Sequence, residues 1–450
     1  MYPWSESLNS WGRGTGLKID ALGLVTLLGA EEMDRSIGRL VPSMYLEYLP
    51  VFGAFVVAGN RFTTKKPGFV LYNISAGIMT TELAGWFSRW LQTQDFKQVR
   101  SIVTWQLVER PRRWREFVVG LLFVGLPVHG MLIALTVLAA DWWGFANVIA
   151  MAISVIVRCI LVAQNRAGID ANILKAQEAA QGYPAKRAKY DESMKSLGSL
   201  RQNGPAMKGA KIPIEPQDPN KIAKVIVLTE DSKVVTLAVP AYLPKLAFAV
   251  NPQPPNRYIY RACQWIGWAA FAVHVISIGM AALYTQIFSV VVTIVATVLT
   301  AHRVGCEDSQ IWESIRSHWS HGNKVQGNSC WVSSKLKATI SMYPEEYMDW
   351  PELEEQKPLS AHVGNKEKSG EPSWTRQTGL PDLESTPISK NKKPESRQDL
   401  FAWLDLTKEE DEVLIAWGLI PHNREWQSAY LEKKDIHRRR FGMMALESTH

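Results

Sequence analysis

The sequence predicts a mainly α-helical polytopic membrane protein with about six spans, a small cytosolic β-hairpin insert and a partly disordered tail. Three observations lead to this fold class. Residues 262–302 form a run of 41 residues without Asp, Glu, Lys or Arg. Two further apolar runs cover residues 117–140 and 142–163. Several of the 18 tryptophans lie where apolar runs end, as aromatic belts do at membrane interfaces.

The lengths of these runs set the number of spans. A helix needs about 20 apolar residues to cross about 30 Å of hydrocarbon, so residues 117–140 and 142–163 each suffice. Arg158, the one charged residue of the second run, lies close enough to its end to snorkel. As a single helix the 41-residue run would be about 60 Å long, so it predicts two spans, at about 263–283 and 286–301.

Two other apolar segments bring the predicted number of spans to about six. Residues 41–59 contain Glu47 as their one charged side chain, and residues 69–91 contain Glu82 and Arg89. The shorter apolar run at 21–30 has ten residues, which predicts an interfacial helix rather than a span.

Basic residues in the loops predict the orientation. The loop 92–116 carries six Lys and Arg and the loop 164–262 carries fifteen, whereas the connection at Asp141 carries none. Both basic loops are therefore expected in the cytosol, together with the two termini. The loop 60–68 is also basic but falls on the outer side. If only the first of the two additional segments spans, this conflict disappears and the N-terminus moves outside.

The loops between the spans contain one clear β signal. Residues 222–240 hold two β-branched runs on either side of Glu230-Asp231-Ser232-Lys233, which predicts a β-hairpin. An isolated hairpin is only marginally stable, so we expect this one to pack on another part of the chain or on a partner. Residues 169–181 are expected to be helical, and a linker follows them.

The end of the chain predicts a tethered helical module. Residues 352–396 are rich in Pro, Glu, Lys and Ser, which predicts disorder. Thr407 and Glu410 form a capping box, Gly418 can end that helix, and residues 423–440 predict a second helix. The module could dock a cytosolic protein partner or fold back on the protein's own surface.

The chain therefore divides into seven parts: a cytosolic N-terminal segment, four spans, a basic loop with the hairpin, two spans, a juxtamembrane segment, a disordered linker and the helical module. Their bounds are 1–40, 41–163, 164–262, 263–303, 304–351, 352–396 and 397–450.

Ionisable residues inside a bilayer are costly and mark functional sites by default. Counted from the span ends, Glu82, His129 and His274 all fall near the middle of the membrane. One hypothesis is a polar site in which they bind a proton, a substrate or a metal. Alternatively, each histidine makes a single interhelical hydrogen bond. Two histidines on separate helices could also ligate a haem, although only this pair is available.

A second group resembles zinc ligands. Cys306, His318, His321 and Cys330 follow the last span with the pattern C-x11-H-x2-H-x8-C. Neither cysteine has a near neighbour of the kind that zinc fingers use, so we expect no metal and no cofactor. Nucleotide-binding and hydrolase motifs are absent from the sequence. Because the basic residues lie in loops between apolar runs, nucleic acid is not an expected partner.

Four stretches in order resemble a family of polytopic integral membrane proteins from filamentous fungi with no established biochemical activity. They are residues 157–170, the hairpin at 224–240, residues 261–268 with His274, and residues 397–406. The resemblance implies a eukaryotic membrane protein and carries over no site residue. Some such proteins are encoded beside small-molecule biosynthetic genes, which implies an accessory pathway role by analogy.

These observations favour a scaffold or transport accessory that is bound to the lipid bilayer and recruits cytosolic partners through its tail, and the resemblance implies a place in fungal secondary-metabolite biosynthesis. The alternative is a membrane-embedded enzyme that acts on a hydrophobic small molecule, with Glu82, His129 and His274 as acid and base groups. A carrier is disfavoured because the span pairs show no internal repeat. The sequence indicates neither the substrate nor the organelle.

Overall fold

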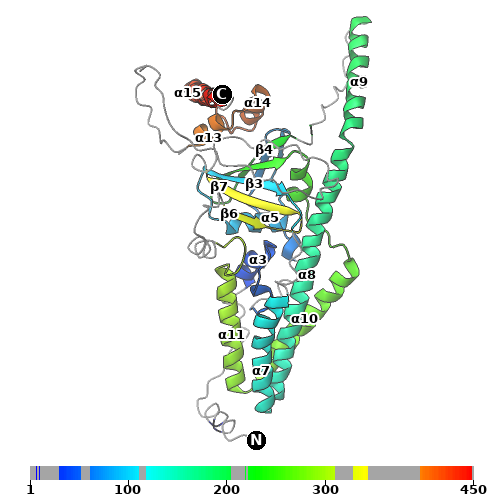
Figure 1. Ribbon diagram of the computed structural model, residues 1–450, viewed down its shortest axis with the longest axis vertical. Helices are drawn as coiled ribbons and strands as arrows, with labels where there is room; N and C mark the ends of the chain where they lie inside the picture. The colour runs from blue at the N-terminus through cyan, green and yellow to red at the C-terminus, as the bar shows by residue number, and fades with distance from the viewer. Residues whose placement is uncertain are drawn as a thin grey trace, which may run out of the picture.

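The computed structural model describes residues 30–51, 61–110, 118–203, 221–309, 328–342 and 396–447, with the single residues 7, 10 and 218. The described chain has two parts along its long axis. Long helices form the lower part in Figure 1, and a sheet flanked by shorter helices forms the upper part.

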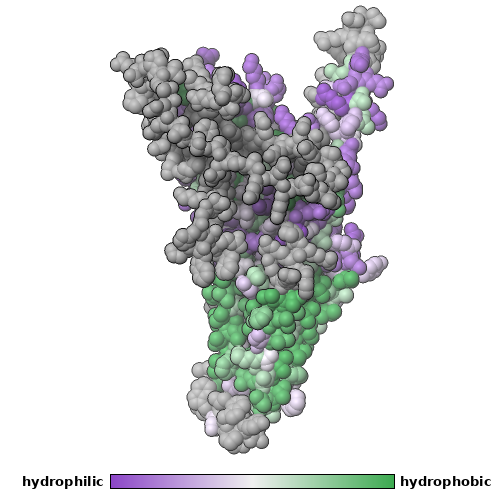
Figure 2. All heavy atoms as spheres, in the orientation of Figure 1, coloured by the Kyte–Doolittle hydropathy of each residue, from purple (hydrophilic) through white to green (hydrophobic). Residues whose placement is uncertain are grey.

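Among the described residues, four helices are long and apolar enough to cross a membrane. They are Val118–Leu138, α8 (Trp142–Gln181), α10 (Arg257–Met280) and α11 (Leu283–Ala301). The first comprises a π-helical segment, η3 (Leu121–Gly125), and α7 (Leu126–Leu138). Figure 2 shows the hydrophobic surface gathered over these helices, with hydrophilic side chains around the upper part. These helices match the four spans predicted within 117–163 and 263–301.

The helices form two hairpins whose turns are joined by one carboxylate. Asp141 caps α8 by accepting a hydrogen bond from the Gly144 N–H at 2.9 Å. Its second oxygen accepts from the Ala282 N–H, in the turn between α10 and α11, at 3.0 Å. The two turns therefore meet at the end of the helices remote from the sheet (Figure 1).

The seven strands in the described part of the chain form one sheet in the order β2-β1-β4-β5-β3-β7-β6. Adjacent strands are antiparallel except β3 and β5, which are parallel. Strands β1 to β3 precede the long helices, β4 and β5 lie between α8 and α10, and β6 and β7 follow α11. Their bounds are β1 Val70–Asn73, β2 Ile78–Thr80, β3 Ser101–Leu107, β4 Ile222–Leu228, β5 Val234–Pro240, β6 Asn328–Trp331 and β7 Leu336–Met342.

The predicted hairpin is real, but it is not a separate insert. β4 and β5 pair antiparallel, with Val225 opposite Leu237, and they occupy the middle of the sheet. Val225 and Val227 belong to the core on one face, and Ile226 to the core on the other. A strand covered on both faces has apolar residues at consecutive positions rather than at alternate ones, which explains its sequence.

The prediction that residues 69–91 span the membrane is wrong. This segment forms β1, β2 and helix α5 (Gly85–Thr93) of the upper part. Its large side chains fill the core of that part, where the rings of Phe87 and Phe248 stack at 4.4 Å. Composition alone does not distinguish a buried strand and helix from a span, and four candidate spans are therefore described in place of six.

Other expectations on the N-terminal half have mixed outcomes. Of the predicted span 41–59, residues 41–51 contain only the short 3₁₀ helix η1 (Leu46–Tyr48), and 52–59 lie outside the described residues. The predicted interfacial helix at 21–30 also lies outside them except for Ala30, which begins α3 (Ala30–Gly38). The short helix η2 (Arg61–Thr63) precedes β1. Another short helix, η4 (Pro244–Ala249), lies between β5 and α10.

The linker predicted after residue 181 is partly wrong. α8 runs to Gln181, and a second helix, α9 (Tyr183–Asn203), extends beyond the sheet (Figure 1). The Ala, Lys and Arg residues at 185–189 belong to a segment read as linker, but they are good helix formers. The disordered linker predicted at 352–396 lies outside the described residues except for Ser396, which caps the next helix.

The tail folds back on the sheet. It forms α13 (Arg397–Trp403), α14 (Lys408–Ala416) and α15 (Arg424–Glu447). The predicted capping box of Thr407 and Glu410 is confirmed, and Gly418 has a φ of +69° just after α14. Apolar side chains from all three helices and from the sheet form one core: Tyr72, Ile74, Val99, Ile102, Ile226, Val234, Leu400, Phe401, Leu414 and Tyr430 are among its members.

We expect Leu414→Ala to destabilise the tail module by about 2–5 kcal/mol, because Leu414 is fully buried against the sheet and its truncation leaves a cavity. Denaturant unfolding of the detergent-solubilised protein, followed by tryptophan fluorescence, measures the effect. Leu431→Ala is the matched control on the exposed side of α15 and should change stability by less than about 0.5 kcal/mol. Equal effects of the two substitutions would contradict the docked arrangement.

Candidate functional site

The structure does not bring the three predicted site residues together. Glu82 lies in the loop between β2 and α5, where its side chain is 70% exposed and forms an ion pair with Lys65. It belongs to the sheet part because residues 69–91 are not a span. The proposed intramembrane carboxylate is therefore absent from the helix bundle.

The two histidines do lie in the long helices. His129, on α7, has its Nδ1 atom 2.9 Å from the Gly125 carbonyl oxygen of its own helix. His274 lies on the face of α10 that carries the buried residues Cys263 and Gly267, and α10 packs along α8. Within the described ranges, His129 Nε2 and His274 Nδ1 are buried without a hydrogen-bond partner. No hydrogen bond joins the two imidazoles in that part of the chain.

A row of hydroxyl groups along α11 was missed in the sequence. Thr285, Ser289, Thr293 and Thr297 recur every fourth residue and are buried on one face of the helix. Asn147 of α8 donates a hydrogen bond from Nδ2 to Ser289 Oγ at 3.2 Å. Small hydroxyl side chains let membrane helices approach closely. The four-residue spacing was the available signal, and the hydroxyl row packs α11 against α8.

Buried arginines join the long helices to the segment that precedes the sheet. Arg158 of α8 is 4% exposed and donates from one nitrogen to the carbonyl oxygens of Leu46, Glu47 and Leu49 at 2.6–3.1 Å. Arg166, two turns further on, donates to the Leu40 carbonyl oxygen at 2.7 Å. Arg158 thus does not snorkel to water, because carbonyl groups at the end of η1 satisfy it inside the protein.

The charges at this junction compensate one another. Burial alone would raise the pKa of Glu47, but the hydrogen-bonded guanidinium of Arg166 outweighs it and lowers the pKa below its ordinary value. Glu47 is therefore ionised at neutral pH. A second buried ion pair joins Arg39 to Asp308 at 2.6 Å, on the chain segment that follows α11.

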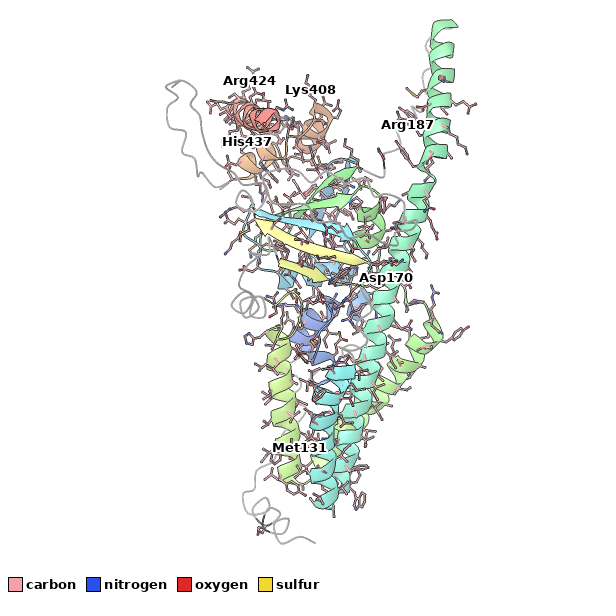
Figure 3. All side chains as sticks on the ribbon, viewed as in Figure 1. Met131, Asp170, Arg187, Lys408, Arg424 and His437 are labelled. Carbon is pink, nitrogen blue, oxygen red and sulfur yellow. The ribbon has the colours of Figure 1, made fainter. Side chains whose placement is uncertain are left out.

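The upper part of α8 is also fixed to the sheet. Asp170 accepts hydrogen bonds from Ser334 Oγ and, at 3.2 Å, from the Lys335 N–H, both in the loop before β7. Figure 3 shows Asp170 on α8 at the level of the sheet, above Met131 in the lower part and below Arg187 on α9. Together with the arginine contacts, this fixes the sheet relative to the long helices.

The cysteine and histidine cluster is only partly described. His318 and His321 lie outside the described residues, and Cys306 and Cys330 are buried free thiols. Within the described ranges, no group of three His, Cys, Asp or Glu side chains could hold a metal ion. Burial raises the pKa of the Cys330 thiol, so it is protonated at neutral pH and is a poor metal ligand.

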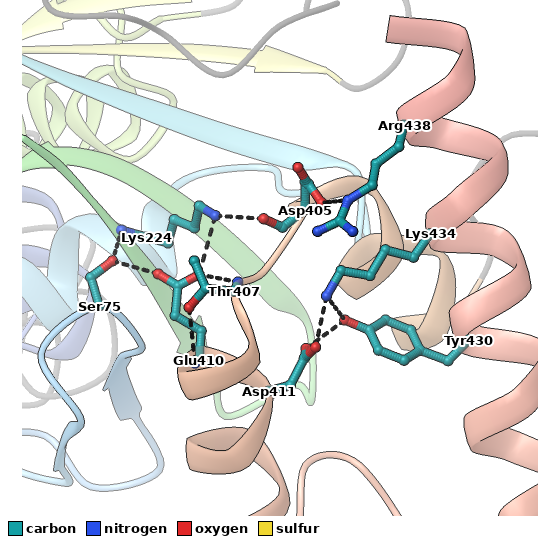
Figure 4. Close-up of polar contacts among 9 residues, drawn as sticks. All are labelled: Ser75, Lys224, Asp405, Thr407, Glu410, Asp411, Tyr430, Lys434 and Arg438. Atoms are coloured by element: carbon teal, nitrogen blue, oxygen red, sulfur yellow. Dashed lines mark hydrogen bonds and ion pairs between the residues drawn. The ribbon is translucent and has the colours of Figure 1, made fainter. Parts of the chain in front are cut away.

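Polar contacts fix the tail on the sheet at Lys224 of β4 (Figure 4). Its Nζ atom lies 3.2 Å from Glu410 Oε2 and donates to the Asp405 carbonyl oxygen at 3.0 Å. Ser75 donates from its hydroxyl to Glu410 at 3.1 Å and accepts from the Lys224 N–H at 3.0 Å. Glu410 also completes the capping box of α14. One carboxylate therefore both caps the N-terminus of α14 and holds this helix on the sheet.

A second polar group joins the helices of the tail to one another (Figure 4). Asp411 of α14 accepts hydrogen bonds from Tyr430 and Lys434 of α15 at 2.6 and 2.7 Å. Arg438 donates to Asp405 at 2.6 Å. Since Lys434 is buried, its pairing with Asp411 is needed to compensate its charge. The tail is therefore a module with its own internal contacts.

Comparison of this chain with known protein families, with curated proteins and with solved structures finds no match.

We expect Arg158→Met to lower the free energy of unfolding by about 2–4 kcal/mol, because it leaves three buried carbonyl groups without their donor. Thermal unfolding in detergent measures this loss. Lys186→Met, on the exposed side of α9, removes a positive charge from solvent and should have an effect below about 0.5 kcal/mol. A wild-type melting temperature for Arg158→Met would show that the junction does not need this donor.

The tail should also weaken in acid through Asp399. Partial burial would raise the pKa of Asp399, but hydrogen bonds from Lys433 and Ser396 lower it below its ordinary value. Stability from a lowered pKa is present above the unfolded-state value, about 3.9 for Asp, and is lost as the pH falls through the folded-state value. The melting temperatures of wild type and Asp399→Asn should therefore differ at pH about 7 and converge below pH about 4. A difference independent of pH would assign the effect to packing.

Proposed function

We propose that this protein is an integral, multi-pass membrane scaffold that holds a folded domain at a fixed position on the cytosolic face. Cytosolic partners would bind α9 and the outer side of the tail. The supporting observation is that Arg158 and Arg166 fix α8 to the segment before the sheet and Asp170 fixes it to the loop before β7, while α9 extends beyond the sheet.

The orientation follows from the distribution of basic residues. The two turns remote from the sheet, at residues 139–141 and 281–282, contain no Lys or Arg. The described Lys and Arg residues lie instead toward the sheet side. They include Lys65 and Lys66, whose loop conflicted with the predicted orientation only because 69–91 was counted as a span. By the positive-inside rule the sheet side is cytosolic, and both ends of the four-helix unit open on that side.

Helix α9 is the element best suited to recruit a partner. From 184 to 195 every side chain except Arg187 and Tyr190 is exposed. Those two contact each other, with the Arg187 guanidinium 5.5 Å above the Tyr190 ring, and Arg187 pairs with Asp191 at 3.4 Å. A helix that is polar on all sides is stabilised by such local pairs and presents charge rather than an apolar face. We therefore expect a polar partner surface.

The alternative is a membrane-embedded enzyme that uses the two histidines. One observation favours it: the buried nitrogens of His129 and His274 have no hydrogen-bond partner within the described ranges. The position of Glu82 counts against it, because the site loses its only carboxylate. A role in fungal secondary metabolism is part of the proposal by resemblance alone.

A comparison of metabolites in cells and medium separates the two functions. The scaffold predicts that Lys186→Glu with Lys189→Glu, which reverses two exposed charges of α9, reproduces the profile of cells lacking the protein. His129→Phe and His274→Phe should leave the wild-type profile unchanged, because neither residue contacts α9.

The enzyme predicts the opposite pattern, with a precursor accumulating in the histidine variants and a normal profile in the α9 variant. Immunoblots of the membrane fraction control for equal amounts of each variant. A product that is made in normal amounts but stays inside the cells would identify an export accessory.

A further inference from the structure

The exposed side chains on the outer face of α10 change from charged to apolar along the helix. Arg257, Arg261, Trp265 and Ile276 recur at intervals of four or eleven residues, so they share one side of the helix. All of these side chains are exposed, and Trp265 is exposed by 77%. The charged residues come first, the tryptophan follows about 6 Å beyond Arg261, and aliphatic side chains occupy the rest.

The position of this face matches a membrane boundary. From Tyr258 to Met280 the helix rises about 33 Å, close to the thickness of the hydrocarbon layer. Tyr258, 89% exposed, and the two arginines therefore lie at the level of the lipid headgroups on the sheet side. Figure 1 shows the first turns of α10 leaning outward, away from the other long helices.

The two arginines are not used inside the described structure. Neither Arg257 nor Arg261 forms an ion pair with a described residue, whereas Arg39, Arg89, Arg110 and Arg166 each pair with a carboxylate. Asn256 caps the N-terminus of α10 by accepting hydrogen bonds from the N–H groups of Tyr258 and Ile259, so the arginines are not needed there. The available groups are thus the two guanidinium groups, one turn apart.

We propose that Arg257 and Arg261 bind the headgroup of an anionic phospholipid, with Tyr258 and Trp265 as anchors on its glycerol and acyl regions. This inference rests on the proposed membrane placement. A guanidinium group forms paired hydrogen bonds with phosphate oxygens, and two of them also favour a second negative charge such as that of phosphatidylserine. The adjacent aromatic and aliphatic side chains require a ligand with an acyl chain, which distinguishes a lipid from a soluble phosphate.

The test uses the full-length protein in nanodiscs of phosphatidylcholine alone or with about 30% phosphatidylserine. Lipids retained after detergent extraction are quantified by mass spectrometry, and the melting temperature is measured in both nanodiscs. We expect wild type to enrich phosphatidylserine and to melt at a higher temperature in its presence. Arg257→Gln with Arg261→Gln should reduce the enrichment, by up to roughly five-fold for each arginine.

The matched control is Lys186→Gln with Lys189→Gln, which removes the same charge from α9, beyond the sheet. It should keep the enrichment, and high salt should weaken it in wild type. Equal retention of both lipids by wild type, or an equal loss in both double variants, would overturn the proposal. Recovery in the membrane after carbonate extraction tests the membrane placement separately, so a protein that stays in the membrane without lipid preference refutes this inference alone.

Discussion

The pairing of strands from three separate stretches of the chain is the constraint on which the rest of the structure depends. β3 pairs with β5, which follows the first helical hairpin, and with β7, which follows the second. Strands of one sheet lie on one side of any membrane, so in the proposed membrane placement each intervening pair of helices crosses and returns. In that placement the sheet requires an even number of crossings between its strands, independently of any count of hydrophobic runs.

The junction between helices and sheet shows how this arrangement is kept rigid. Buried charges are costly unless they are paired, and here Arg158 and Arg166 are matched by carbonyl groups and by Glu47 from the segment around η1. Arg39 and Asp308 repeat the pattern at the end of α11. The same interactions that compensate these charges prevent the sheet from rotating freely above the helices.

The sequence was sufficient for features that depend on local pattern. Uncharged length predicted the four long helices, β-branched runs predicted β4 and β5, and the capping box predicted α14. The prediction from sequence failed where tertiary contacts decide the structure. Residues 69–91 have the composition of a membrane span, but their tryptophans fill the core of the sheet domain. For the same reason Glu82 was placed in the membrane. The contacts of Arg158, made with a segment more than a hundred residues away, have no local signature.

The strand order also has a consequence for biogenesis. During synthesis β3 emerges before any of the long helices, yet neither of its neighbours in the sheet exists until a helical hairpin has been made. In the proposed membrane placement, the edges of β3 therefore stay unpaired while first two and then four helices are inserted. The sheet can therefore be completed only after both helical hairpins have been inserted. A chain with a misinserted hairpin would display open strand edges, which are a ready substrate for aggregation and for quality-control chaperones.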